Sequence, residues 1–485
     1  MKLNFPYIAH ALGALLVAEG IFMLIPFLYA LHLGESSVGA FYSSMLYALV
    51  VGAALWITTY RRVSTRTKKR DIFFLVSVGW VVVTAVGVLP FVLSGAIPSF
   101  TNAFFETTSG FTATGATLIQ NIDSLEKSVL LWRSITQWMG GMGVIVLVIA
   151  ILPLVGSSGM QLFAAEAPGV FTDKLHPRIR DTAKKLWLVY IALTILAAAA
   201  YALAGMGLFD AINHALTTIS TAGYSTHSAS IGFFDSATIE YVAIAFMFLA
   251  GTNFALLYYL FLGRLGRFRR NTEFKYYVAI IAGATLFIAG GLAVSQGGSL
   301  EVAFRTALFH VVSIMTTTGY TTADYQLWPT YLTFIIFALM FIGGMAGSTS
   351  GGIKVMRHVV LFRNSLLEFK RQLFSNAILP IRLNGASISE NVTSRIVAFI
   401  IIYILLCILS VFIMLVLGND PLTSVGATAA TLGNVGPGIG GVGPAETYIG
   451  LSAASKYFLA ALMFIGRLEL FTVLILFTPY FWRRG

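Results

Sequence analysis

Charged residues are scarce in this chain of 485 residues. Asp, Glu, Lys and Arg make up 11% of it, whereas hydrophobic residues make up 57%. Soluble domains carry about 25% charged residues, so this composition excludes an ordinary soluble protein. Together with a mean hydropathy of +0.84, it indicates an all-α polytopic membrane protein whose helices cross the lipid bilayer several times.

Cysteine is nearly absent as well. The one cysteine, Cys407, lies within an apolar run, where a thiol usually serves as a packing group. Disulfides and cysteine-based metal sites are therefore excluded. The sequence also lacks a G-x-G-x-x-G motif after a strand and has no nucleophile–base or metal-ligand cluster. We therefore expect that the chain binds no nucleotide by itself and is not an enzyme.

Long apolar runs, by contrast, are frequent. Ten of them approach the ~20 residues that a helix needs to cross a bilayer. They lie at 9–31, 38–60, 72–94, 129–155, 183–206, 238–263, 276–296, 331–350, 394–418 and 456–481. No small-residue cleavage site follows the first run, so we expect a retained helix there and not a signal peptide.

Basic residues account for the formal net charge of +11 and gather on one side of the predicted membrane, one cluster per loop. The clusters lie at 61–70, 174–185, 264–275 and 354–395, with Lys2, Arg483 and Arg484 at the chain ends. By the positive-inside rule this side is the cytoplasm, and both termini lie there. Clusters that are dispersed in this way do not form one nucleic-acid-binding surface, so no nucleic acid partner is expected.

Acidic residues gather between the runs on the opposite side. They are Glu35, Asp123, Glu126, Asp210, Asp235, Glu240, Glu301, Asp324, Asp420 and Glu446. The polarity of loops explains any single one of them. As a group they predict a negative outer mouth, which would raise the local concentration of cations.

Four segments share a pattern of a short apolar stretch, too short to cross the membrane, followed by a polar turn that contains glycine. They read FETTSGFTATGA (105–116), NHALTTISTAGY (213–224), FHVVSIMTTTGY (309–320) and GATAATLGNVGP (426–437). Non-helical backbone at membrane depth is tolerated only inside protein or along a water-filled path. Glycine reaches backbone conformations that other residues avoid, and a ring of carbonyl oxygens can replace the hydration shell of an ion.

These segments recur about every hundred residues, which is longer than a solenoid period and indicates repeated domains. We expect an N-terminal transmembrane hairpin at 1–65. Four repeats of span, half-helix, turn and span follow, at 66–170, 171–265, 266–375 and 376–485. Half-helices directed at one axis would form a pseudo-four-fold pore from a single chain. The candidate ion filter comprises Thr112, Ala113, Thr114, Gly115, Ser220, Thr221, Ala222, Gly223, Thr316, Thr317, Thr318, Gly319, Asn434, Val435 and Gly436.

A glycine- and serine-rich segment, 342–354, interrupts the eighth run. Glycine costs about 1 kcal/mol relative to alanine inside a helix, so the run predicts a broken span of the kind found at gates and hinges. Close helix packing through small residues is the alternative. The candidate gate residues are Gly343, Gly344, Gly347, Ser348, Thr349, Ser350, Gly351, Gly352 and Lys354.

Arg467 lies within the last run, in the place that Gly141, Gly251 and Gly344 occupy in the other repeats. Because an arginine inside the membrane is costly, it is a functional candidate. It could place positive charge below the filter, or donate hydrogen bonds to carbonyls freed by the broken span. A structural ion pair with Glu469 is the third possibility.

With these turns, the broken span, Arg467 and the extra hairpin, the whole chain resembles the TrkH family of bacterial Trk potassium uptake systems, which is related to KtrB, plant HKT and fungal Trk transporters. The resemblance implies ten full spans and four re-entrant pore half-helices, with each repeat similar to a simple potassium-channel subunit. It maps the filter glycines onto Gly115, Gly223, Gly319 and Gly436. It also maps an intramembrane gating loop onto the glycine-rich segment, with Arg467 facing that loop.

The same resemblance implies partners and a location. Such proteins form homodimers in the bacterial cytoplasmic (inner) membrane and bind a cytosolic ring of TrkA, a nucleotide-binding regulator. We expect that ring to contact the basic cytoplasmic loops, above all 354–395. The transported ion would be K⁺, with Rb⁺ accepted and Na⁺ and Li⁺ weaker. Since each turn shares only one glycine, the discrimination should be modest.

Two transport mechanisms remain open on the sequence. One is a channel-like pore that passes K⁺ inward along the electrical gradient. The other is a K⁺/H⁺ or K⁺/Na⁺ symporter, which needs a proton relay or a second ion site. Its intramembrane candidates are Glu19, Glu106, His214, His310 and Glu469. Glu106, His214 and His310 hold equivalent places in their half-helices, which favours a role in packing or filter support.

Overall fold

The computed structural model describes residues 3–61, 68–151, 179–264, 266–374 and 379–483, and within these the fold is almost entirely helical. The helices up to residue 270 are α1 (Phe5–Leu33), α2 (Val38–Tyr60), α3 (Lys69–Gly87), α4 (Leu89–Leu93), α5 (Phe100–Phe111), α6 (Lys127–Ile151), α8 (Ile179–Leu203), α9 (Leu208–Ile219), α10 (Ala237–Ala250), α11 (Phe254–Phe261) and α12 (Gly266–Arg270). The later helices are α13 (Thr272–Gln296), α14 (Leu300–Met315), α15 (Thr330–Leu339), α16 (Val355–Leu373), α17 (Glu390–Val416), α18 (Pro421–Leu432), α19 (Ala453–Arg467), α20 (Phe471–Leu474) and α21 (Pro479–Trp482).

Within these described ranges, six helical stretches are long and apolar enough to cross a membrane, or up to eight if two bent pairs each count as one span. The six are Phe5–Leu33, Val38–Tyr60, Arg70–Leu93, Lys184–Leu203, Thr272–Ser295 and Glu390–Val416. The run predicted at 129–155 is helical as far as Ile151; its last residues lie outside the described part, as do the expected repeat boundaries near 65, 170, 265 and 375. Several of the predicted basic positions, among them Lys2, Arg62, Arg66, Lys174, Arg178 and Arg484, also lie outside it.

Two predicted spans are divided, which the sequence analysis did not anticipate. The run at 238–263 bends by 109° between α10 and α11, and the run at 456–481 bends by 111° after α19. The first break has a local cause, because the Asn253 side chain accepts hydrogen bonds from the backbone N–H groups of Ala255 and Leu256 and so begins a new helix. At the second break, Glu469 and Leu470 adopt positive φ angles, which an L-residue cannot keep inside a helix.

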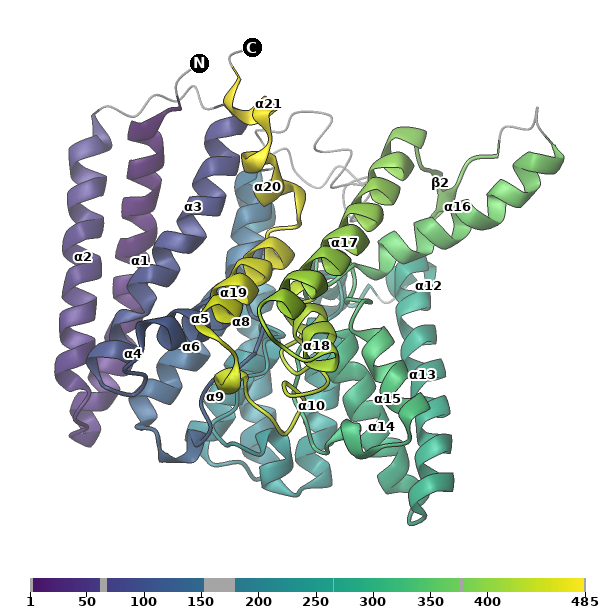
Figure 1. The fold of residues 1–485 in the computed structure, drawn as a ribbon, viewed down its shortest axis with the longest axis horizontal. Helices are drawn as coiled ribbons and strands as arrows, with labels where there is room; N and C mark the ends of the chain where they lie inside the picture. The colour runs from purple at the N-terminus through teal and green to yellow at the C-terminus, as the bar shows by residue number, and fades with distance from the viewer. Residues whose placement is uncertain (1–2, 62–67, 152–178, 265, 375–378, 484–485) are drawn as a thin grey trace.

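The run at 331–350 breaks as predicted. Helix α15 ends at Leu339, and the backbone stays non-helical until α16 begins at Val355. Small residues packed within a continuous helix are therefore not the explanation. The segment after it, predicted as a long cytoplasmic loop, is instead mostly ordered: α16 is an amphipathic helix that projects from the body of the protein (Figure 1). It is followed by a short antiparallel pair of strands, β1 (Arg382–Leu383) and β2 (Ala386–Ser387).

The N-terminal hairpin of α1 and α2 stands at one side of the molecule (Figure 1). Its two helices approach closely through small residues. A side chain on Gly13 would lie 2.7 Å from the carbonyl oxygen of Gly52, and one on Gly52 would lie 2.8 Å from the backbone nitrogen of Val17. Because apolar surface is no driving force in lipid, such close backbone packing is what holds helix pairs together there.

Candidate functional site

Four short helices, α5, α9, α14 and α18, end in the interior of the protein. Each stops four residues before one of the predicted filter glycines, and the turn that follows is closed in the same way in each. These hydrogen bonds are Thr114 N to Ser109 O (2.9 Å), Ala222 N to Thr217 O (3.0 Å), Thr318 N to Ser313 O (2.8 Å) and Val435 N to Ala430 O (2.8 Å). The four turns thus share one backbone geometry despite their different sequences.

The turns also share an unusual alternation of backbone angles. The residue two before each glycine has positive φ, the next does not, and the glycine again does. These φ angles are 54° at Ala113, 52° at Thr221, 58° at Thr317 and 52° at Asn434, and 83°, 78°, 79° and 99° at Gly115, Gly223, Gly319 and Gly436. A left-handed backbone conformation therefore recurs at the same two places in every turn. Glycine occupies the second place in all four turns, and it adopts this conformation without the strain that a side chain brings.

The glycines lie against one another's turns in a closed ring. A Cβ on Gly115 would collide with the carbonyl oxygen of Ala222, one on Gly223 with that of Thr318, and one on Gly319 with that of Val435. A Cβ on Gly436 would lie 2.7 Å from the carbonyl oxygen of Thr114. The fourth turn therefore contacts the first, and the ring is closed. The four predicted filter segments therefore meet at one place.

Most carbonyl groups of this ring have no hydrogen-bond donor in the described part of the protein. Among the described residues, only three of the candidate filter carbonyls accept a hydrogen bond: Ser220 from the Thr221 hydroxyl, Ala222 from Gln137 and Gly436 from the Tyr448 hydroxyl. Buried carbonyl groups normally find a partner. A cation at the centre of the ring would supply one for the rest, because carbonyl dipoles can replace its water shell.

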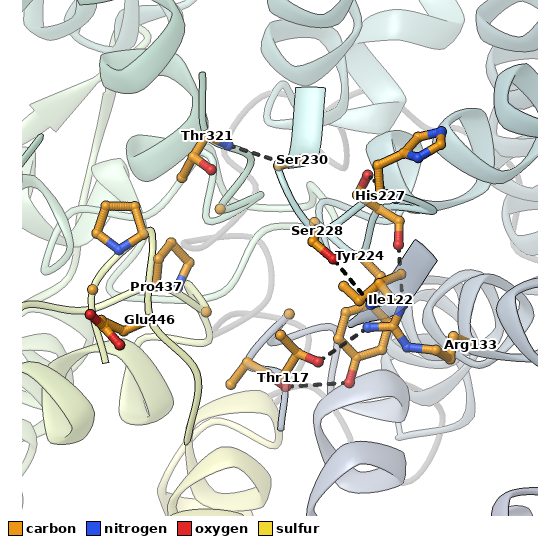
Figure 2. Close-up of a pocket in the computed structure, with 18 residues that line it drawn as sticks. Thr117, Ile122, Arg133, Tyr224, His227, Ser228, Ser230, Thr321, Pro437 and Glu446 are labelled. Carbon is orange, nitrogen blue, oxygen red and sulfur yellow. Dashed lines mark hydrogen bonds between the residues drawn. The ribbon is translucent and has the colours of Figure 1, made fainter. Parts of the chain in front are cut away.

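One pocket, with a volume of about 80 Å³, opens on this ring. All four filter glycines line it, together with residues of the outer loops such as His227, Ser230 and Glu446. Figure 2 shows Arg133 beside Tyr224 on one wall, with Pro437 and Glu446 on the other. The pocket is a vestibule through which an ion could reach the ring.

Acidic groups lie near the vestibule, as the sequence predicts. Glu446 is part of its wall. Asp123 lies behind it and bonds to His227, with 2.7 Å between Oδ1 and Nδ1. Partial burial raises the pKa of Asp123, but hydrogen bonds from Ser228 and His227 outweigh this effect and hold the pKa below its ordinary value. Asp123 is therefore ionised at neutral pH.

Buried polar side chains brace three of the turns from behind. Glu106 accepts a hydrogen bond from Leu118 N (2.8 Å), after the first glycine. The Nε2 atom of His214 lies 3.0 Å from Ser225 Oγ, after the second glycine. The Nε2 atom of His310 lies 3.0 Å from Ala323 O, after the third. The fourth repeat has Ala427 at this position. Of the other residues considered for ion coupling, Glu19 is fully buried without a hydrogen-bond partner among the described residues.

Arg133 is a residue of this site that the sequence analysis did not single out. Its side chain, 1% exposed, lies 2.9 Å from Glu106 and donates to the carbonyl oxygen of Ser225 in the second turn. It also lies over the ring of Tyr224, at 4.1 Å from the centroid. Arg133 thus links the first two turns. An arginine inside an apolar run, one of few in this chain, was the available signal.

Replacing Arg133 with methionine should lower the free energy of unfolding by about 3–5 kcal/mol, because the Glu106 carboxylate would remain buried without its cation. Thermal unfolding in detergent measures this loss. Adding Glu106→Gln to the same protein should recover part of it. The matched control is Arg371→Met, which breaks a half-exposed pair with Glu368 and should cost at most about 1 kcal/mol. Equal losses in the two single variants would contradict the role of Arg133.

The glycine-rich segment between α15 and α16 forms a loop directly below the ring. A hydrogen bond from Gly343 N to Ile353 O (2.9 Å) joins the two ends of the loop. Above, Gly351 N donates to the Thr317 hydroxyl (2.7 Å), and the Thr349 hydroxyl donates to Ile219 O (3.0 Å). The loop thus touches the undersides of the second and third turns.

Arg467 reaches this loop from the end of α19. Its guanidinium donates to the carbonyl oxygens of Thr349 (2.7 Å) and Gly140 (3.2 Å). The proposed structural pair with Glu469 is wrong, because Glu469 bonds instead to Arg357, at 2.7 Å. Of the three interpretations of Arg467, the geometry therefore favours donation to carbonyls of the broken span.

The remaining candidate gate residues bond within the loop. The hydroxyl groups of Ser348 and Ser350 form a hydrogen bond of 2.7 Å. The Ser350 hydroxyl also accepts a hydrogen bond from Gly344 N, at 3.0 Å. The Lys354 ammonium donates to the carbonyl oxygen of Ser350. Gly347 lies against the Asn253 side chain, and Gly352 lies over Gly343. All the predicted gate residues thus belong to one structural unit.

Two supports of the loop escaped sequence reasoning. Glu273, 1% exposed at the start of α13, accepts hydrogen bonds from Ala346 N (2.7 Å) within the loop and from Met356 N (3.2 Å) just after it. Asn253, at the break between α10 and α11, donates to Ala346 O at 2.6 Å. An acid just before one apolar run and an Asn within another were visible signals. The loop that they hold could not be identified from the sequence.

Comparisons with known proteins agree with this architecture. The family model described as TrkH, cation transport protein, matches residues 38–289 and 298–483. The chain is 40% identical to the Trk system potassium uptake protein TrkH of Salmonella typhimurium, over 99% of this chain and all of that protein. It is 34% identical to TrkG of Escherichia coli K12, over 98% of each. A crystal structure of the potassium transporter TrkH from Vibrio parahaemolyticus superposes with a TM-score of 0.91 at 37% identity, covering both chains fully.

Proposed function

Because this chain belongs to the TrkH family of cation transport proteins, we propose that it takes up K⁺ across the bacterial cytoplasmic membrane through a channel-like pore. The observation that carries the proposal is the closed ring in which each filter glycine lies against a carbonyl of the next turn. Most of its carbonyl groups accept no hydrogen bond from a described residue, and such groups suit a dehydrated monovalent cation. The relatives named above are potassium uptake proteins, which supports K⁺ as the transported ion.

The proposed topology has ten full spans and four re-entrant pore helices, α5, α9, α14 and α18. An N-terminal hairpin (1–65) precedes four pore repeats, at 66–170, 171–265, 266–375 and 376–485. The pseudo-four-fold axis runs through the filter ring, and the vestibule faces outward. Both termini and the basic loops then lie in the cytoplasm, as the positive-inside rule requires.

In this proposal the loop 343–354 is the gate. It fills the space below the filter and is held there by Arg467, Thr317 and the Ile219 carbonyl. The projecting α16 continues directly from the loop and carries basic residues in its last turn. It is suited to transmit the state of a cytosolic, TrkA-type nucleotide-binding ring. The functional unit is a homodimer bound to that ring.

Flow of K⁺ along the electrical gradient, without coupling to a second ion, provides enough energy to accumulate K⁺ in the cell. The membrane potential supplies about 2.3 kcal/mol per charge per 100 mV, which concentrates K⁺ without a second ion. Three of the groups considered for coupling, Glu106, His214 and His310, are hydrogen-bonded in equivalent bracing positions. This arrangement supports a structural role for them, and we favour the channel-like mechanism over symport.

Purified protein in liposomes loaded with K⁺, without a pH or Na⁺ gradient, should take up Rb⁺. External K⁺ should block this uptake far more strongly than Na⁺ does, because the ring is built of carbonyl dipoles. Empty liposomes are the control. Uptake that begins only when a proton or Na⁺ gradient is imposed would contradict the channel-like mechanism and favour symport.

A further inference from the structure

The filter ring is not equivalent at all four turns, and the difference lies at Gln137. This residue is on α6, in the first repeat, and its side chain is fully buried. Its Nε2 donates to the carbonyl oxygen of Ala222 at 2.7 Å, and its Oε1 accepts from the backbone N–H of Tyr224 at 3.0 Å. One carboxamide thus bonds to the backbone on both sides of Gly223, in the second turn.

The other three turns lack this clamp. Gly141 lies against Ser220 and Gly251 against Thr316, at matching places in successive turns, which fixes the correspondence between the repeats. The equivalent residues in the third and fourth repeats are Gly344 and Arg467. The residues four positions before Gly141, Gly251, Gly344 and Arg467 are, in this order, Gln137, Met247, Met340 and Met463, and all four are fully buried. Methionine has no N–H to donate. The carbonyl groups that correspond to Ala222, those of Thr114, Thr318 and Val435, accept no hydrogen bond from a described residue.

The clamped carbonyl belongs to the ring itself. A Cβ on Gly115 would collide with the oxygen of Ala222, so this oxygen lies at the junction of the first and second turns. A donor that holds it has two effects. It draws electron density toward the amide, which weakens the field that this oxygen offers an ion, and it prevents the second turn from moving inward. Discrimination among alkali cations depends on the number, field strength and freedom of such carbonyl groups.

From this geometry we infer that Gln137 is a positioning residue that sets the cation selectivity of the pore. It holds the Ala222 carbonyl at the spacing that suits K⁺ and Rb⁺ and opposes contraction around the smaller Na⁺ and Li⁺. The inference rests on the proposed function, since it assigns the selectivity of that same filter. It places the determinant behind the second turn, on a helix of the first repeat.

The test replaces Gln137 with methionine, the residue of the other repeats, which is similar in volume. The ratio of Rb⁺ to Na⁺ uptake in liposomes should fall about two- to tenfold, the range expected for the loss of one or two buried hydrogen bonds. A ratio is independent of how much protein is folded, so a purely structural role would not change it. Gln137→Glu, assayed at alkaline pH, keeps the shape but removes the donor to Ala222, and its ratio should fall in the same direction.

The matched control is Gln326→Met, which removes another bond between a Gln side chain and the backbone. There Gly440 N donates to Gln326 Oε1 in an outer loop, and the ratio should stay unchanged. Unchanged ratios in both Gln137 variants would overturn the inference while leaving the proposed function intact. Binding is measured in parallel, as the increase in Tm that K⁺ or Na⁺ gives the detergent-solubilised protein. If neither the wild-type protein nor Arg467→Met, in which the loop is expected to open, takes up Rb⁺, the proposed function fails. The K⁺ to Na⁺ ratio of the Tm shifts still decides the role of Gln137 in that case.

Discussion

Replacing Gly223 with alanine should reduce Rb⁺ uptake by about five- to 150-fold. The new methyl group would collide with the carbonyl oxygen of Thr318 in the neighbouring turn, so either that carbonyl leaves the ring or the second turn does. Overpacking of this kind costs about 1–3 kcal/mol, and each 1.4 kcal/mol lost from ion binding is tenfold. Initial rates of Rb⁺ uptake into liposomes measure the effect.

The chain offers a matched control for this substitution. Gly205 also has a positive φ, of 104°, but no atom lies within 4 Å of the position that its Cβ would take. Gly205→Ala therefore imposes the same kind of backbone strain without touching the ring, and uptake should stay near the wild-type rate. Equal loss in both variants would mean that backbone strain, and not the contact between turns, accounts for the effect of Gly223→Ala.

Replacing Arg467 with methionine should increase Rb⁺ uptake by the purified protein, in the absence of the proposed regulatory ring, by about tenfold or more. The guanidinium holds the loop through Thr349 O and is itself anchored on Gly140 O. A hydrogen bond from a charged group is worth about 1.5–3 kcal/mol, so its loss should shift the balance between closed and open loop by about 10- to 150-fold. Uptake in liposomes measures the increase, with Lys127→Met on the outer surface as the control for loss of charge.

Arg467→Lys separates the two functional roles of this residue. Lysine keeps the positive charge but cannot reproduce the two-pronged donation of the guanidinium. If Arg467 clamps the loop, the lysine variant should resemble the methionine variant. Wild-type behaviour in Arg467→Lys, with increased uptake in Arg467→Met, would show that charge repulsion below the filter is the main barrier. A folded methionine variant with unchanged uptake would exclude both roles.

The four turns of the candidate filter could be predicted from the sequence because their requirements are local. A short helix, a polar turn and a glycine at a fixed distance are written within a dozen residues, and the helices end where this pattern predicts. The broken span at 342–354 was visible for the same reason. In each case glycine marks a backbone conformation that few other residues tolerate.

The supports of the site could not be predicted, because each depends on a contact between distant segments. Arg133 and Gln137 belong by sequence to the first repeat but bond to the second turn, 92 and 85 residues away. Glu273 holds the loop across 73 residues. The pairing of Glu469 with Arg357 was likewise hidden, since Arg467 was nearer in the sequence. Such partners are set by how the repeats pack, which the pattern within one repeat does not encode.

The ring of turns can close only late in synthesis. Its last contact joins the fourth turn to the first, because the Asn434 side chain donates to the Thr114 hydroxyl, 320 residues earlier. Ribosomes add about 5–20 residues per second, so the first turn waits roughly 15 to 60 s for this neighbour. A nascent chain that holds only the first three turns therefore has an open ring. Assembly of the ring is thus a late folding event that joins segments made far apart in time.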